Sequence, residues 1–326
     1  MKAGKLSEAV LKRSVLRQLH MTENQIKPAV GMDYGAIRTG ETEMVVSAMA
    51  TRCLGTQILP EAGVYAAVNN LLCSGARPLG VMVQFLLPTA YTENGLRELV
   101  AAVDAACVKE ELLVLGGHTE VVRSVAEPVI TVTALGATEA GKLKSAAAAE
   151  PGMDILVTKS VGLEGTALLA MQRESELAER YALPFIDKAK TFAGYLSVRS
   201  EAAVAIKSGV AAMHDLSEGG VFGALWELGQ CSGVGLEIDL KKIPIRQETV
   251  EICEYFDLNP YKLLSGGSIL MAAKDGNALA HAIRQAGAEA VVIGKATAGN
   301  DRIIYNAEES RYLETTQTDE LWKLEK

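Results

Sequence analysis

Residues 112–121 constrain the fold most, because an apolar run is followed at once by a glycine pair and a polar triplet. The run Leu-Leu-Val-Leu predicts a buried strand. Gly116 and Gly117 predict a tight turn at its end, since glycine adopts backbone conformations that a β-carbon disfavours. We expect His118, Thr119 and Glu120 to project from the carboxyl end of this strand, where open α/β sheets commonly bind ligands.

A second stretch, residues 213–225, repeats this design. A short apolar strand at 210–213 runs into Asp215, Glu218 and the pair Gly219 and Gly220, and a helical pattern follows. Backbone N–H groups at such a helix start suit a phosphate, and the two acids suit the metal that accompanies it. One glycine pair alone is typical of a plain hairpin turn, but the repetition favours a ligand site.

The two motifs, GGHTEV and MHDLSEGGVFGAL, resemble those of the superfamily of aminoimidazole-ribonucleotide (AIR) synthetase and the hydrogenase-maturation protein HypE, which includes selenophosphate synthetase and thiamine-monophosphate kinase. The resemblance is greatest to HypE-like, AIR synthase-related proteins. It extends over nearly the whole chain, with VNNLLCSGARP (68–78) and LNPYKLLSGGSIL (258–270) as further matches. It implies an α/β (α+β), PurM-like two-domain fold, with an N-terminal β-α-β-α-β-β domain that forms the dimer and a C-terminal α/β domain.

Residues 137–152 combine alanine, charge, proline and glycine without strand periodicity, so we place the domain boundary there. The expected units are an ATP-binding and dimerisation domain at 1–145 and a second domain at 146–326. Hydrophobic periodicity predicts alternating elements in both. Expected strands are 43–50, 79–87, 112–115, 128–136, 154–158, 210–213, 235–239, 268–273 and 290–295, and expected helices are 5–20, 61–75, 93–109, 199–208, 219–230, 247–256 and 276–287. The polar tail from residue 314 is expected on the surface.

Composition excludes several classes of protein. The net charge of −8 and the lack of a Lys/Arg block argue against nucleic acid as the main partner. No apolar run is long enough for a membrane span, and the charged N-terminus lacks a signal-peptide core. The five cysteines are scattered, which is typical of reduced thiols in a cytoplasmic protein and not of a zinc site or a disulfide framework.

Relatives carry a magnesium-binding Asp near residue 33, and Asp33 matches it, although an Asp in any surface turn would look the same. Two other acids of the family pattern are replaced here, by Met49 after the first strand and by Asn70 in the Asn69–Asn70 pair. Methionine cannot bind Mg²⁺, and an amide offers only a neutral oxygen. The sequence therefore predicts a metal site with fewer charges than its relatives have.

Residues 159–166 contain two glycines before a helix, a pattern that also occurs at plain helix starts. The loop is not a Walker A motif. The resemblance places it near the nucleotide, so Lys159, Gly162 and Thr166 are candidate contacts. Among the histidines, His118 and His214 flank the glycine pairs, and for each a binding role and a plain packing role remain open.

The resemblance implies an ATP- and Mg²⁺-dependent enzyme that activates a carbonyl, amide or phosphate acceptor by phosphoryl transfer, as a homodimer with the nucleotide between the first domains. Asp33, Glu120 and Asp215 would hold magnesium, the four motif glycines with Asn69, Asn70, Thr119 and Glu218 would contact the nucleotide, and His118 would donate to developing charge. The last cysteine is Cys253, so the tail thiol that HypE modifies has no counterpart, and we expect a different acceptor. The alternative is a regulatory homologue that binds a nucleotide or metabolite with little turnover.

Overall fold

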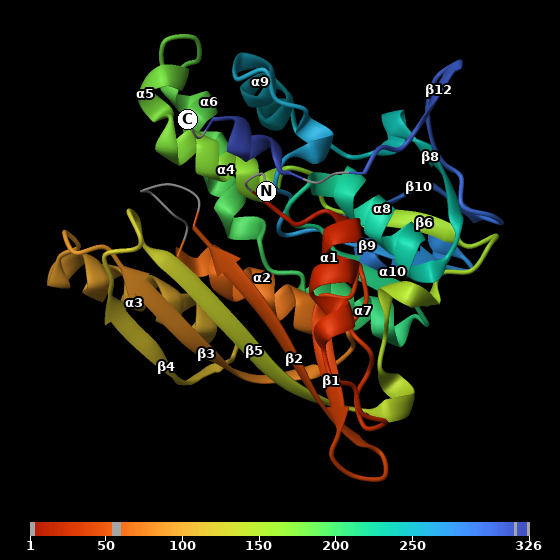
Figure 1. The fold of residues 1–326 in the computed structure, drawn as a ribbon. Coiled ribbons are helices and arrows are strands. Elements are labelled where there is room, and N and C mark those ends of the chain that lie inside the picture. The colour runs from red at the N-terminus through yellow and green to blue at the C-terminus, as the bar shows by residue number, and fades with distance from the viewer. Residues whose placement is uncertain (1–3, 54–59, 316–317, 325–326) are drawn as a thin grey trace.

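The computed structural model describes residues 4–53, 60–315 and 318–324, which form two β-sheets with associated helices (Figure 1). The first sheet has five strands in the order β1-β2-β5-β3-β4. The second has seven in the order β12-β11-β8-β10-β6-β9-β7. This arrangement confirms the predicted α/β fold, with two halves that are each built on one sheet.

Helices and strands alternate along most of the chain, as the hydrophobic pattern predicts. The first half contains α1 (Glu8–Ser14), β1 (Tyr34–Arg38), β2 (Glu43–Arg52), α2 (Pro60–Cys73), β3 (Arg77–Leu87), α3 (Glu93–Lys109), β4 (Leu113–Val121) and β5 (Val129–Glu139). The second half contains β6 (Asp154–Thr158), α4 (Leu163–Gln172), α5 (Glu174–Leu177), α6 (Leu183–Lys190), α7 (Arg199–Lys207), β7 (Ala212–Asp215), α8 (Gly220–Ser232), β8 (Gly235–Asp239), α9 (Gln247–Tyr255), β9 (Ile269–Ala273), α10 (Gly276–Gln285), β10 (Ala290–Thr297), β11 (Arg302–Asn306) and β12 (Glu309–Tyr312).

Within the part of the chain that the structure describes, helices cover the first sheet on one face only. Helices α2 and α3 pack on that face, and α2 buries Val64, Val68 and Leu71 against it (Figure 1). The opposite face, here called the open face, exposes large apolar side chains. Val45, Met49, Leu79 and Met82 are each more than a third exposed. The sheet is mixed, since β3 and β4 are parallel and the other pairs antiparallel. A solvated sheet face normally carries polar residues, so this apolar face is unusual for a free surface.

The tight turn predicted at Gly116 and Gly117 is wrong, because β4 continues through both glycines to Val121. Gly117 is required for a different reason: a β-carbon there would lie 1.8 Å from the carbonyl oxygen of Val83 in β3. The strand is also exposed, not buried: it is the last strand of the sheet, and the side chains on both of its faces are accessible. An apolar run of this length is typical of a buried strand, and the sequence did not reveal its position at an edge.

Buried polar contacts join the two halves. Arg52 on β2 and Glu164 on α4 form a bidentate ion pair, with Nε–Oε1 at 2.8 Å and Nη2–Oε2 at 3.2 Å. Asn69 on α2 donates to the carbonyl oxygen of Leu196 at 2.8 Å and accepts from the N–H of Val198 at 3.2 Å. One buried apolar cluster also runs through both halves. The two halves, and the residues at their junction, therefore hold fixed positions relative to each other.

Several segments differ from expectation. The N-terminal helix is shorter than 5–20, and every residue of α1 is at least partly exposed. Strands β1, β11 and β12 and helices α5 and α6 were not predicted. The tail is not confined to the surface, because Asp319, Glu320 and Leu321 are buried. None of the helices within the described residues is long and apolar enough to cross a membrane.

Candidate functional site

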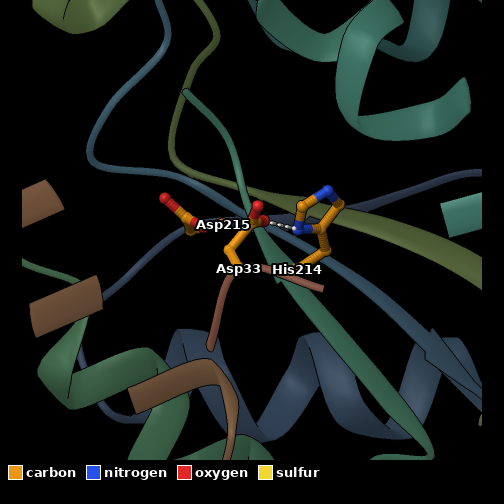
Figure 2. Close-up of side chains that lie close together, drawn as sticks. All are labelled: Asp33, His214 and Asp215. Atoms are coloured by element: carbon orange, nitrogen blue, oxygen red, sulfur yellow. Dashed lines mark ion pairs between the residues drawn. The ribbon is translucent and has the colours of Figure 1, made fainter. Parts of the chain in front are cut away.

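Three side chains from distant parts of the sequence converge at the junction of the two halves (Figure 2). Asp33 lies in the loop before β1, and His214 and Asp215 end β7. One ligand atom from each residue lies within 4.8 Å of those of the other two. His214 and Asp215 are buried, whereas the Asp33 side chain is 31% exposed. We call these three residues the acidic cluster.

His214 is held between two carboxylates. Its Nδ1 lies 3.0 Å from Oδ2 of Asp33, and its Nε2 lies 3.0 Å from Oε2 of Glu227 on α8. The other oxygen of Glu227 lies 3.1 Å from Nζ of Lys5. Burial disfavours the imidazolium, but the Asp33 and Glu227 carboxylates outweigh it and raise the pKa of His214 to about 10. Both ring nitrogens thus face carboxylates, and an imidazolium has no free lone pair to offer a metal.

The two aspartates of the cluster differ in charge state. Burial alone would raise the pKa of Asp33, yet the positive charge of His214 lowers it to about 2. Burial and then the Asp33 carboxylate raise the pKa of Asp215 to about 7. Asn70 contacts Asp215: with its amide oriented to satisfy both groups, it donates to Oδ1 and, at 3.3 Å, to Oδ2. Asp33 is thus ionised throughout the neutral range, whereas Asp215 loses its proton only near neutral pH.

This donor set fits a hard divalent cation. Oδ2 of Asp33 is buried and has no well-aligned hydrogen bond within the described residues, so its contact with His214 is purely that of an ion pair. Carboxylate oxygens are the ligands that Mg²⁺ prefers, and a cation would relieve the repulsion that raises the pKa of Asp215. Asp33 and Asp215 would hold such an ion.

The structure does not bring the residues of β4 to this cluster within one chain. Glu120 lies on the edge strand, and β2, β5 and β3 separate that strand from β1, which follows Asp33. Nε2 of His118 lies 3.1 Å from Oε2 of Glu120, and both side chains are more than half exposed. Gly116, Gly117 and Thr119 lie on the same strand. This second group is exposed next to the open face.

The candidates at 159–166 have other partners. Nζ of Lys159 contacts the carbonyl oxygens of Tyr195, Ser197 and Gly267 and lies 2.7 Å from Oε1 of Glu201. The N–H of Gly162 donates to Ser265 Oγ at 2.7 Å, and the buried Oγ1 of Thr166 donates to the Gly162 carbonyl oxygen at 2.6 Å. These contacts, like those of Asn69 between the halves, favour structural roles over nucleotide binding.

The start of α8 carries an unexpected carboxylate. Gly219 adopts a φ of +85°, and its N–H donates to Oδ2 of Asp319 at 2.8 Å. Burial raises the pKa of Asp319 to about 7. The tail thus supplies an anionic group at the position predicted for a phosphate. Glu218 and Gly220 flank Gly219, and Glu218 remains partly exposed.

Sequence reasoning missed Lys5, Glu227 and Asp319. Glu227 lies within an apolar helix pattern, and Lys5 and Asp319 lie in segments that had no motif. The spacing of His214 and Glu227 carries no recognised signal, because their contact depends on how α8 packs against β7. The resemblance alone pointed to Asp33.

Comparisons with known proteins agree with the fold. Residues 32–138 match the N-terminal domain and residues 150–306 the C-terminal domain of AIR synthase related proteins. The carbamoyl dehydratase HypE of Rhodobacter capsulatus is 30% identical over 241 residues, which cover 72% of this chain and 68% of HypE. A Methanocaldococcus jannaschii protein, provisionally named a hydrogenase expression/formation protein, is 24% identical over 318 residues, covering 92% of this chain and 90% of that protein.

Solved structures share this architecture at low identity. HypE from a HypE–HypF complex superposes with a TM-score of 0.75 at 19% identity, covering 93% of this chain and 99% of that chain. HypE in complex with ATP gives a TM-score of 0.72 at 16% identity, covering 96% and 95%. ThiL complexed with AMPPCP and TMP gives 0.69 at 20% identity, covering 96% and 98%.

Proposed function

Because this chain belongs to the family of AIR synthase related proteins, we propose that it is an ATP-dependent enzyme that activates a carbonyl, amide or phosphate acceptor by phosphoryl transfer. The observation that carries the proposal is the convergence of Asp33 and Asp215 from the two halves into one acidic pair, in which Asp215 is buried. The names of the relatives support it: the curated HypE proteins are carbamoyl dehydratases, and solved HypE and ThiL structures hold ATP or AMPPCP.

Asp33 and Asp215 are the groups that hold magnesium in this proposal. The metal would neutralise phosphate charge during transfer. His214 keeps Asp33 ionised and fixes the direction of its carboxylate, and Glu227 and Lys5 hold His214 in turn. Asn70 orients Asp215. The protein thereby presents a rigid pair of carboxylates, which suits a reaction in which positioning does most of the work.

We place the β4 group, His118 to Glu120 with Gly116 and Gly117, in a site completed by a second copy of the chain. The open face exposes Met49 by 62% and Met82 by 47%, and β4 exposes Leu113 by 68% and Leu115 by 52%. Apolar surface of this extent favours association. A homodimer that buries it would bring Glu120 of one protomer toward the acidic cluster of the other.

Phosphate groups are assigned to the start of α8, where Gly219 and Gly220 follow Glu218. The N–H of Gly219 is now bonded to Asp319, so an anion that binds there must displace this carboxylate. Asn69, Lys159, Gly162 and Thr166 are assigned to holding the two halves and their loops together. Their side chains and N–H groups are already bonded to the protein.

The acceptor is placed on a separate molecule. Cys253 is buried in the core at 1% exposure, and burial raises the pKa of its thiol to about 12. A thiol in that state does not ionise at neutral pH and cannot be reached by a nucleotide. Cys253 therefore does not serve as the modified group.

We expect 5 mM ATP with excess Mg²⁺ to raise the melting temperature of the protein by several degrees, because ligand bound only to the folded state stabilises it; a concentration of about 100 times Kd adds about 2.7 kcal/mol. The measurement is a thermal shift with ATP and magnesium, repeated with EDTA. The matched control is Asp33→Asn, which removes one metal ligand and should lose the shift. A wild-type protein that shows no shift, or a shift that EDTA leaves intact, contradicts the proposal.

The second candidate function, a regulatory nucleotide-binding protein with little turnover, rests on Met49 and Asn70. Asn70 contacts Asp215 directly. In the antiparallel pairing of β1 and β2, Tyr34 lies opposite Ala48. Asp33 precedes Tyr34 and Met49 follows Ala48, so these two residues are neighbours at the end of the pairing. Asn70 thus lies beside the acidic cluster and reduces its charge, whereas the side chain of Met49 is 62% exposed on the open face.

The double variant Met49→Asp with Asn70→Asp separates the two functions. Two added carboxylates should tighten magnesium-dependent ATP binding at least about tenfold, equivalent to about 1.4 kcal/mol, because charge drives hard-cation binding. Without metal the variant should be less stable than wild type, since Asn70→Asp sets a carboxylate against the buried Asp215. Titration calorimetry with AMPPCP and magnesium measures the affinity, and Asn69→Asp is the control. If wild type already hydrolyses ATP when an acceptor is added, the regulatory function is excluded.

A further inference from the structure

A cavity of about 710 Å³ lies between α1, residues 29–33 and α8, directly beside the acidic cluster. One end is polar, with Lys5, Asp33 and Glu227. The remaining wall is largely apolar and includes Leu6, Leu11, Val30, Met32 and Trp226. A mainly apolar cavity with a few convergent polar groups is the usual form of a small-molecule site.

Helix α1 covers this cavity without packing tightly on the protein. It has apolar residues on one stripe, yet none of its seven residues is buried. Its fixed contacts are polar: Glu8 Oε2 accepts from Trp226 Nε1 at 3.4 Å, and Lys5, just before the helix, pairs with Glu227. In contrast, the 29–33 loop packs closely, since a β-carbon on Gly31 would lie 2.8 Å from the Glu227 carbonyl oxygen. The space under α1 is thus bounded by a rigid floor and a loosely packed cover.

Trp226 forms a fixed aromatic wall of this cavity. The guanidinium carbon of Arg302 lies 4.4 Å from its ring centroid, and Arg302 itself is buried on β11 and held by Gln230 at 3.3 Å. The indole N–H is directed to Glu8. With one face against Arg302 and the N–H bonded, the ring cannot turn freely, and its cavity side is a preformed stacking surface.

The charges that line the cavity are paired with each other. Lys5 pairs with Glu227, Lys12 with Glu8, and Asp33 with His214. A strongly charged ligand would have to break one of these pairs. The lining therefore suits a ligand whose portion inside the cavity is neutral.

We propose that this cavity binds a neutral, planar heteroaromatic ring stacked on Trp226, with a polar substituent directed toward Lys5 and Asp33. The inference rests on the proposed function in one respect, namely that the ring belongs to a participant in the reaction at the acidic cluster. Two participants share this chemistry, the acceptor and the base of the nucleotide. The ring-binding step itself requires neither metal nor phosphoryl transfer.

The test uses Trp226 as a reporter. The chain contains two tryptophans, and Trp322→Phe leaves Trp226 alone. This change is mild because Trp322 Nε1 has no hydrogen bond within the described residues. Fluorescence is titrated, without metal, with three ring probes (nicotinamide, adenosine and uridine) and with cyclohexanecarboxamide, which matches nicotinamide in size and amide group but is not planar.

We expect saturable quenching by at least one ring probe and binding of cyclohexanecarboxamide that is about tenfold weaker, since stacking adds up to about 1.5 kcal/mol. The ring probe that quenches Trp226 should also slow tryptic cleavage in α1 of wild-type protein, where Lys12 and Arg13 are exposed. In thermal shift, Trp226→Phe should keep the stabilisation by the probe and Trp226→Leu should lose it. Absence of saturable quenching by all three ring probes, or an equal response to cyclohexanecarboxamide, overturns the inference.

Addition of magnesium and AMPPCP distinguishes the two sources of the ring. Competition with the bound probe identifies the base of the nucleotide as the natural occupant, and simultaneous binding identifies the acceptor. Failure of this inference is separate from failure of the proposed function. A protein that binds magnesium-ATP but no ring probe loses only the inference, and one that binds a ring probe but no magnesium-ATP loses only the proposed function.

Discussion

Replacing Asp215 with Asn is expected to make the protein more stable at pH 8 in the absence of metal and to abolish its response to magnesium. Asp215 is 2% exposed, and burial followed by the Asp33 carboxylate raises its pKa from 3.8 to about 7. The folded-state pKa exceeds the unfolded one, so the favourable contribution is complete below pH 3.8 and is lost as pH rises through about 7. Above that pH the ionised group destabilises the fold by on the order of 2–4 kcal/mol, which Asn removes.

Urea unfolding in EDTA measures this difference at several pH values. The free energy of unfolding of Asp215→Asn should exceed that of wild type by an amount that grows between about pH 4 and pH 7 and is constant above. Asp33→Asn is the matched control with the opposite sign. The pKa of Asp33 is lowered to about 2, so its loss should destabilise the protein at neutral pH. An Asp215→Asn protein that is less stable than wild type at pH 8, or that magnesium still stabilises, would contradict the assignment.

Mixed dimers should recover nucleotide sites that both parent variants lack. If Glu120 of one protomer joins Asp215 of the other, dimers of Glu120→Gln and of Asp215→Asn each contain only damaged sites. A heterodimer of the two contains one site with both substitutions and one with none. In a symmetric dimer it should therefore bind magnesium-AMPPCP at about half of its sites with wild-type affinity.

Co-expression with two different affinity tags isolates the heterodimer, and titration calorimetry counts its sites. The control heterodimer pairs Asp33→Asn with Asp215→Asn. Both residues lie in the acidic cluster of a single chain, so every site is damaged and none should recover. If the Glu120–Asp215 heterodimer also shows no site, Glu120 does not complete the cluster of its partner.

Hydrophobic periodicity predicted most elements of the fold because burial produces a regular pattern. Helix α3 and strands β6 and β8 were predicted at the bounds that the structure has. The prediction failed where an apolar run is exposed in the structure. The run at 112–115 has the composition of a buried strand, but β4 lies at the sheet edge with all its residues exposed. An apolar run does not reveal whether its own chain covers it.

The candidate site was predicted only in part, since it depends on contacts between distant segments. Asp33 and Asp215 were expected together, and they converge. Glu227 and Lys5 were not expected, because their positions follow from the packing of α8 and of the N-terminal segment. Lys159 and Thr166 had the residue types of a phosphate loop, yet protein groups bond both of them. Residue type thus indicated a possible chemistry, and packing decided its partners.

The bond between Asp319 and the start of α8 has a consequence for affinity. A carboxylate tethered to the same chain competes with any incoming anion at a high effective concentration. Each anion that reaches Gly219 must first release Asp319. Its observed dissociation constant is therefore the intrinsic one divided by the fraction of molecules in which Asp319 is released. Shortening or loosening this tail would therefore change ligand affinity without altering a single group that touches the ligand.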